Sequence, residues 1–245
     1  MNEATGSAES RADLYDIITT HLELLPALQR AETVYDRGTA QHSARVGKIC
    51  ALIGQVLGLS SADIGVLTWV GALHDVGKLA VTEAVLQKHS GSFTDAEWAD
   101  LRRHTEVGEH LVMALDHQLA PIADAVRSHH ERWDGSGYPD GLAGGAIPEW
   151  ARIVAVADVY DLLTHDQPYR HSTLNHDAAV QMVVEGRGTK FEPRVVDAFV
   201  RLDQRGVLAP IAHSMQHRPQ AVSALSAARR EPVGTRHRRS RLPLA

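Results

Sequence analysis

The sequence of 245 residues contains a single cysteine, Cys50. One thiol cannot form a disulfide within the chain, so a disulfide-stabilised fold is excluded and a reducing cytoplasm is the expected environment. No apolar run approaches the roughly 20 residues that a membrane-spanning helix needs. The polar, acidic opening MNEATGSAES also differs from a signal peptide. We therefore expect a cytoplasmic protein without a membrane association.

The chain also lacks a basic body. Its formal net charge is −5, but residues 229–245 hold six Arg and one Glu, a charge of +5, so the preceding 228 residues carry about −10. Such a body is a poor candidate for nucleic-acid binding. The Arg-rich end contains Pro and Gly and is predicted to be a solvated, disordered tail. A contact of this tail with nucleic acid or an acidic partner is the alternative.

Alternating apolar and polar residues, typical of a β-strand, are absent, and so are internal repeats. Apolar residues recur at helical spacing instead, as in the stripe of Val46, Ile49 and Ile53. Residues 132–147 hold five glycines and are predicted to form a loop. The fold class is therefore predicted to be all-α. Helices are expected over residues 10–30, 40–57, from 60, from 94, 119–131, 148–163, 175–185 and 193–202.

Helix ends are predicted by local motifs. Thr94 and Glu97 have the spacing of a capping box, and Phe93 can pack against Trp98 as a hydrophobic staple. Pro148 suits the first position of its helix, where its missing N–H needs no partner.

Histidines and aspartates recur on or beside the inward faces of five of these helices. A single buried histidine or His–Asp pair is more often structural than a ligand. Burial of seven such groups together would be expensive without a metal or counter-charge. Imidazoles and carboxylates on facing helices can hold two divalent ions, with one aspartate between them. The residues are His42, His74, Asp75, His104, His129, His130 and Asp158.

Three longer motifs carry a family resemblance. They are HDVGK at 74–78, HHERWDGSGYP at 129–139 and ADVYDLLTHDQPYR at 157–170. In this order and spacing they resemble the HD-GYP family of the HD phosphohydrolase superfamily, over residues 42–199. The resemblance implies an HD-domain helical bundle with additional C-terminal helices. It divides the chain into a helical extension (1–35), a catalytic domain (36–205) and a basic C-terminal segment (206–245).

The resemblance also implies an activity. Family members hydrolyse the bacterial second messenger cyclic di-GMP to linear pGpG and often on to GMP. The seven residues above match the family's metal ligands, with Asp75 as the bridging carboxylate. Two divalent ions, with iron or manganese favoured and zinc an alternative, would activate a hydroxide that attacks phosphorus. Lys78 matches a lysine that donates to the leaving oxygen or stabilises it; a surface lysine with a packed stem is the alternative.

Substrate contacts are implied for Asp161, Gln167 and Arg170, and Gly137, Tyr138 and Pro139 form the signature loop. The sequence departs from the family pattern in three respects. Gly38 stands where some members have a third-metal glutamate, so two ions are expected. Gln167 replaces the usual arginine of an Arg-Pro-Tyr motif, which removes one cation from the phosphate grip. The residues before the core are too few for a sensor domain, so regulation is expected from a separate chain or from ligand levels.

Two further hypotheses stay open. The chain is a scaffold of the same fold that contacts a diguanylate cyclase or another signalling protein, or it hydrolyses another cyclic dinucleotide. The complete ligand set argues against the scaffold, and only Gln167 favours it.

We predict that Gln167→Arg lowers KM for cyclic di-GMP by roughly tenfold and leaves kcat nearly unchanged. The added guanidinium would bind substrate and transition state alike, and uniform binding appears in KM. Arg170→Ala should raise KM by more, because it leaves no basic residue in the motif. Steady-state kinetics on the three proteins tests this. An unchanged or higher KM for Gln167→Arg would mean that Gln167 fits a different substrate.

Overall fold

The computed structural model describes residues 17, 24–35, 37–86, 88, 93–165 and 173–213. These residues form helices and no β-strand, apart from an isolated bridge between Arg187 and Phe191, so the all-α prediction is confirmed. None of the described helices has the length and apolar character needed to cross a bilayer. The α-helices are α2 (Leu24–Tyr35), α3 (Arg37–Leu57), α4 (Ser61–Leu73), α5 (Glu83–Leu86), α6 (Asp95–Arg102), α7 (His104–Leu115), α8 (Ala120–Ser128), α9 (Glu149–Thr164), α10 (His176–Glu185), α11 (Pro193–Gln204) and α12 (Ala209–His213). Short 3-10 turns are η1 (Val76–Ala80), η3 (His117–Leu119) and η4 (Gly144–Ala146).

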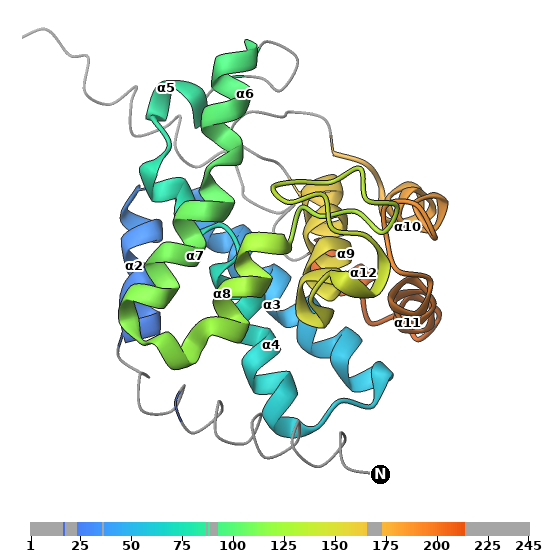
Figure 1. The fold of residues 1–245 in the computed structure, drawn as a ribbon. Helices are drawn as coiled ribbons and strands as arrows, with labels where there is room; N and C mark the ends of the chain where they lie inside the picture. Colours follow the sequence, from blue (N-terminus) through green and yellow to red (C-terminus); the bar gives the residue numbers. More distant parts are fainter. Residues whose placement is uncertain are drawn as a thin grey trace, which may run out of the picture.

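Helices α3 and α9 organise the bundle. Helix α3 packs against α4, α9, α2 and α11, and α9 also contacts α10, α8 and α4 (Figure 1). Most residues of α9 are buried on all sides, as expected for a helix at the centre of a core. Helix α7 packs on α8 and on η1, while α10 to α12 cover the other side of α9 in Figure 1. Polar residues of α3 and α9 can therefore meet in the interior where these two helices pack together.

The predicted helix starts agree with the structure at most positions. Ser60 caps α4 by accepting a hydrogen bond from the Asp63 amide at 3.1 Å. The capping box of Thr94 and Glu97 is formed at the start of α6. The predicted staple is also formed: the Phe93 and Trp98 rings meet edge to face at 4.9 Å.

Three helix boundaries differ from the prediction. Pro148 is the N-cap of α9 rather than its first residue. Helix α8 ends at Ser128, so the paired histidines follow the helix instead of closing it. The helix predicted from residue 94 is divided at Arg103 into α6 and α7. Most of the helix predicted over residues 10–30 lies outside the described residues, and α2 extends to Tyr35.

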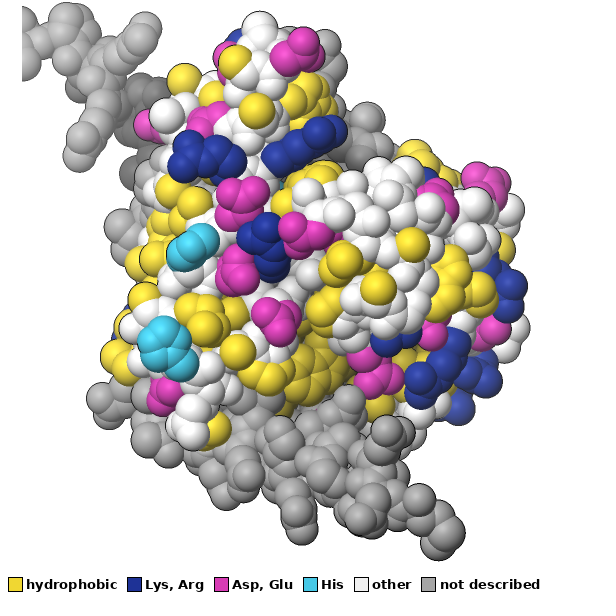
Figure 2. Space-filling view, in the orientation of Figure 1, with side chains coloured by type: hydrophobic (Ala, Val, Ile, Leu, Met, Phe, Trp, Pro, Cys, Tyr) yellow, Lys and Arg dark blue, Asp and Glu magenta, His cyan; other side chains and the backbone are white. Residues whose placement is uncertain are grey.

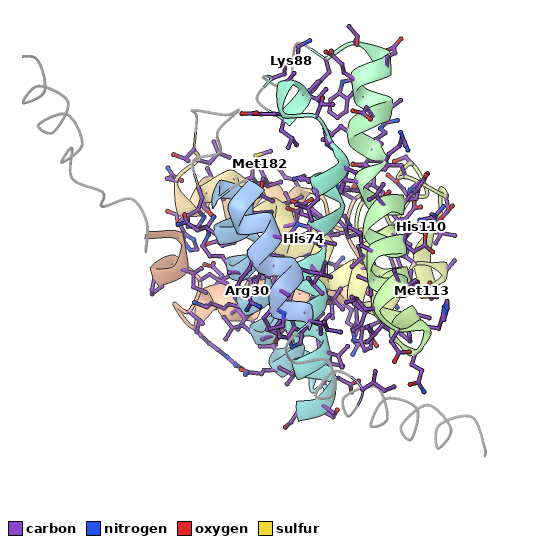
Figure 3. All side chains as sticks on the ribbon, turned by 90° about the vertical axis from the view of Figure 1, so that its left-hand side faces the viewer. Arg30, His74, Lys88, His110, Met113 and Met182 are labelled. Carbon is purple, nitrogen blue, oxygen red and sulfur yellow. The ribbon has the colours of Figure 1, made fainter. Side chains whose placement is uncertain are left out.

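Helices α5 and α6 form a small lobe that projects from one end of the bundle (Figure 1). The Lys88 ammonium contacts both carboxylate oxygens of Glu97, at 2.6 and 2.8 Å, and joins the two sides of this lobe. Figure 3, in which α2 faces the viewer, shows Lys88 on the lobe and His74 well inside the bundle.

Gly77, in η1, allows the closest approach between two parts of the core. A Cβ at this position would lie 1.9 Å from the His104 carbonyl oxygen and 2.6 Å from the Gly108 amide nitrogen. Both are backbone atoms, which cannot rotate away. The contact between η1 and α7 therefore requires a residue without a side chain.

We predict that Gly77→Ala destabilises the protein by about 1–3 kcal/mol, because η1 must move away from α7. For a domain of this size the melting temperature should fall by about 2–12 °C. The matched control is Gly145→Ala, since a Cβ there meets no atom within 4 Å. Its melting temperature should stay close to that of the wild type. Equal melting temperatures for the two variants in differential scanning calorimetry would refute the close-approach argument.

Candidate metal centre

Seven buried or partly buried polar side chains meet where five helices converge. They come from within α3 and α9, from the ends of α4 and α8, and from the start of α7. Six of them expose at most 3% of their surface, and His130 is partly buried. The structure thus brings together all of the residues that the sequence identified as candidate ligands: His42, His74, Asp75, His104, His129, His130 and Asp158.

Asp75 lies between two groups of potential ligand atoms. Within each group these atoms lie within 4.8 Å of one another. The Oδ2 atom of Asp75 is 3.4 Å from His74 Nε2, and its Oδ1 atom is 3.6 Å from His104 Nε2. One carboxylate therefore presents one oxygen to each group, an arrangement suited to a bridging ligand. The groups are His42, His74 and Asp75, and His104, His129 and His130.

Asp158 belongs with the first group. Its Oδ1 atom lies 3.1 Å from His42 Nε2 and 3.7 Å from His74 Nε2. Helix α9 thus supplies a second carboxylate on the side opposite to η1. Mixed imidazole and carboxylate ligands of this kind suit divalent transition metals.

The imidazoles are oriented for metal binding. His74, His104 and His129 each place Nδ1 at 2.8, 2.6 and 2.6 Å from the carbonyl oxygen three residues earlier in the chain. With Nδ1 donating to a carbonyl, the lone pair is on Nε2 and points into the cluster. The Nε2 atoms of His42 and His74 are buried and have no hydrogen-bond partner of acceptable geometry within the described residues. Orphaned buried nitrogens among carboxylates fit a bound cation.

The two carboxylates are ionised. Burial raises the pKa of Asp75, but Lys78 and His74 outweigh it and hold this pKa well below the usual range. Burial likewise raises the pKa of Asp158, and His42 and His74 outweigh it and lower that pKa well below the usual range. Both groups are in the form that binds a cation.

The histidines divide according to whether Asp158 lies beside them in addition to Asp75. In the second group burial lowers the pKa of each imidazole, to about 4 for His104 and about 3 for His130, with His129 also well below its usual range. These rings are neutral at pH 7, as a ligand must be. Burial acts in the same direction on His42 and His74, but the nearby carboxylates outweigh it and raise the pKa of both. A cation at the first group would take the place of these protons.

Asp161 was expected to contact substrate, and the structure shows the protein contacts that this carboxylate makes. The residue is fully buried behind His42, where its Oδ2 atom accepts from His42 Nδ1 at 2.7 Å. The Arg45 guanidinium donates to both Asp161 oxygens, at 2.7 and 2.8 Å, and His165 Nδ1 lies 3.1 Å from Oδ1. Both oxygens therefore have partners within the protein, in an arrangement suited to orienting the His42 imidazole. Arg45 was missed, although it follows His42 by three residues and so shares its helix face.

Lys78 and the signature loop border the cluster. The Lys78 ammonium contacts Asp75 Oδ2 at 2.5 Å, so its charge lies beside the bridging position. The Tyr138 ring stacks on His130 with 4.8 Å between centroids and 29° between planes.

Glu131 was also missed. Its Oε1 atom accepts from the amides of Asp140 and Gly141 at 2.7 and 3.0 Å, which holds the loop that carries Tyr138. An acidic residue directly after the paired histidines was the available signal. A Cβ on Gly137 would lie 2.4 Å from the Arg132 amide nitrogen, so this loop also folds closely on itself.

Two of the expected substrate contacts, Gln167 and Arg170, lie outside the described residues. Gly38 lies on α3, four residues before His42, and has no side chain that could bind a metal.

Comparisons with known proteins show the family of the chain. The model of the HD domain family matches residues 14–195. The chain is 38% identical over 191 residues to the cyclic di-GMP phosphodiesterase response regulator RpfG of Xanthomonas campestris, covering 78% of this chain and 50% of the relative. It is 32% identical over 185 residues to 3′3′-cGAMP-specific phosphodiesterase 2 of Vibrio cholerae, covering 75% of this chain and 35% of the relative. The chain thus spans half or less of the length of these two relatives.

Solved structures share the fold. A cyclic GMP-AMP-specific phosphodiesterase of Vibrio cholerae, V-cGAP3, superposes with a TM-score of 0.58 at 21% identity, over 84% of this chain and 52% of that one. The HD-GYP-type protein Bd1817 of Bdellovibrio bacteriovorus superposes with a TM-score of 0.55 at 18% identity, over 78% and 60%. At these identities the likeness supports the helical architecture alone.

We predict that Asp161→Asn weakens metal binding at the group that contains His42 by about 10–100-fold. An amide cannot accept from His42 and from the Arg45 fork with the same charge, so the imidazole loses its orientation. Titration with Mn²⁺, followed by elemental analysis of the washed protein, measures the occupancy. The group that contains His104 should keep its affinity for Mn²⁺.

The matched control is Asp203→Asn, which removes a second His–Asp contact, the 2.7 Å pair of Asp203 with His176, outside the cluster. If both variants bind Mn²⁺ as the wild type does, Asp161 does not position a ligand.

Proposed function

Because this chain belongs to the HD domain family, we propose that it is a metal-dependent phosphodiesterase that hydrolyses cyclic di-GMP to linear pGpG. The observation that carries the proposal is the position of Asp75, with one oxygen toward each of two histidine groups. The name of RpfG supports cyclic di-GMP as the substrate. The proposed catalytic domain covers residues 36–205.

The proposed centre holds two divalent ions, with iron or manganese favoured and zinc an alternative, as the family resemblance implies; imidazole and carboxylate ligands suit all three metals. Cys50, the one thiol of the chain, is buried in the hydrophobic core. Bound ions would supply charge neutralisation at the phosphodiester and a lower pKa for a water between them. Gly38 at the third-metal position is the reason for two ions rather than three.

The chain's own side chains would then orient and protonate the reactants. Asp75 and Asp158 contribute two negative charges that fix the cations against the interior of the bundle. Lys78, whose ammonium lies beside Asp75, could donate to a phosphate oxygen or to the leaving ribose oxygen of a bound substrate. Tyr138 stacks on His130 and would hold this imidazole in place at the centre.

A second cyclic dinucleotide is the alternative substrate. The resemblance to 3′3′-cGAMP-specific phosphodiesterase 2 favours it, since that relative is 32% identical. Gln167 does not separate these two substrates, because the arginine that it replaces would contact phosphate, which both substrates carry. A diguanylate cyclase or other signalling partner stays a prediction from the family resemblance.

We predict that metal-loaded protein contains two ions per chain and converts cyclic di-GMP to pGpG, and that Asp75→Ala abolishes this hydrolysis and lowers the metal content. No other carboxylate of the cluster lies between the two histidine groups. Elemental analysis and chromatographic separation of products, with 3′3′-cGAMP run in parallel, provide the measurements.

Asp100→Ala serves as the control, since this aspartate lies on α6 outside the cluster. It should hydrolyse as the wild type does. Three ions per chain, or Asp75→Ala protein with a tenth of wild-type turnover, would contradict the proposed role of Asp75.

A further inference from the structure

An aromatic pocket opens beside the metal centre, under the α5–α6 lobe. Its volume is about 410 Å³, within the range of about 300–1,000 Å³ that small-molecule sites occupy. Figure 2 shows basic side chains beside hydrophobic ones where α6 passes into α7, the region that borders this pocket. The pocket's outer wall includes Phe93, Trp98, Arg102 and Tyr138.

The inner end of the aromatic pocket is the metal centre itself. His104, His130 and Lys78 line it there. A ligand with a phosphodiester at the cations therefore has its next group within reach of the pocket. One bound substrate could therefore occupy both the aromatic pocket and the metal centre.

Three aromatic rings, those of Phe93, Trp98 and Tyr138, belong to the outer wall. The Tyr138 ring is held nearly parallel to His130, and the Phe93 ring supports Trp98 from its edge. Trp98 nevertheless keeps 37% of its surface exposed, which is high for an indole. A large aromatic side chain left open at the rim of a cavity is typical of a surface that stacks on a ligand.

Arg102 supplies the polar element of this wall. Its guanidinium carbon lies 5.0 Å from the Tyr138 centroid and 5.8 Å from the Trp98 centroid. Within the described part of the chain, this guanidinium forms no hydrogen bond or ion pair; the neighbouring Arg103 reaches Asp100 at 4.0 Å. Arg102 thus brings a fork of N–H donors to an aromatic cavity without a protein acceptor for them.

We propose that the aromatic pocket binds one purine base of the substrate and that Arg102 selects guanine there. This inference rests on the proposed function, which places a dinucleotide phosphate at the centre. A purine stacks on aromatic and guanidinium faces alike. Guanine presents two acceptors, O6 and N7, that match the arginine fork, whereas adenine presents a donor at the position of O6. An apolar peptide in the pocket would leave the guanidinium and the metal ligands unmatched.

The test measures binding of GMP and of AMP to the full, Mn²⁺-loaded chain by isothermal titration calorimetry. The wild type should bind GMP more tightly than AMP. Arg102→Met keeps an unbranched apolar stem and should weaken GMP binding by about tenfold, with a smaller change for AMP. Arg103→Met is the matched control, one residue away, and should bind both nucleotides as the wild type does.

Trp98→Leu separates stacking from hydrogen bonding. It should weaken both nucleotides by about fivefold or more and remove the quenching of tryptophan fluorescence that a bound base causes. Trp98 is partly exposed, so this change leaves the core intact, and thermal melting verifies it. Wild-type affinity in Trp98→Leu, or the same GMP affinity in Arg102→Met and Arg103→Met, overturns the proposal.

Hydrolysis of cyclic di-GMP by the same variants distinguishes the two proposals. If the wild type hydrolyses cyclic di-GMP and Arg102→Met has an unchanged KM, the base site is wrong and the function stands. If the wild type hydrolyses no cyclic dinucleotide but binds GMP in the order predicted, the function is wrong and the base site stands.

Discussion

The burial of charge in the helical bundle is the constraint on which the rest of the structure depends. Two ionised carboxylates and five imidazoles occupy the space where an ordinary bundle would have apolar side chains. Uncompensated, such groups would cost several kcal/mol each on removal from water. The helix ends solve part of this problem, because ligands at the ends of α4 and α8 reach the interior without interrupting a helix. Cations between the two histidine groups would provide the rest of the compensation.

Outer contacts then determine how precisely the ligands are held. Three imidazoles form a hydrogen bond from Nδ1 to the carbonyl oxygen three residues earlier in the chain. Their orientation therefore follows from the local backbone geometry. His42 lies within α3, and its Nδ1 contacts a side chain rather than a carbonyl. Helix α9 provides this partner, Asp161, and Arg45 holds Asp161 in turn. The histidine that lies within a helix is thus supported by a carboxylate and a guanidinium rather than by a carbonyl near a helix end.

Much of the fold and of the candidate site could be predicted from the sequence because the signals were local. Period-3.6 stripes and the Thr94 cap depend on residues a few positions apart, and the structure agrees with both. The candidate ligands were found because they share stripes with apolar residues. The contacts of Asp161 with His42 and Arg45 were not predicted. In the sequence, a carboxylate one turn after Asp158 has the same spacing whether it faces a substrate or Arg45. The pocket near Trp98 was also missed, because it depends on how α6 stands against the signature loop, a contact between distant segments. The ends of α6 and α8 were missed because the apolar spacing does not stop where these helices end. Helix α7 begins directly after Arg103, and the backbone of His129, after α8, still has helical dihedral angles.

The stacking of Tyr138 on His130 has a thermodynamic consequence. The same ring forms a wall of the pocket and touches a candidate ligand, so the two sites share one structural element. A ligand that moves the tyrosine would change its contact with the imidazole, and a cation that immobilises the imidazole would favour one position of the tyrosine. Coupling of this kind is reciprocal: the factor by which the cation changes nucleotide affinity equals the factor by which the nucleotide changes cation affinity. Cellular metal supply and second-messenger concentration would then act on this protein as linked variables.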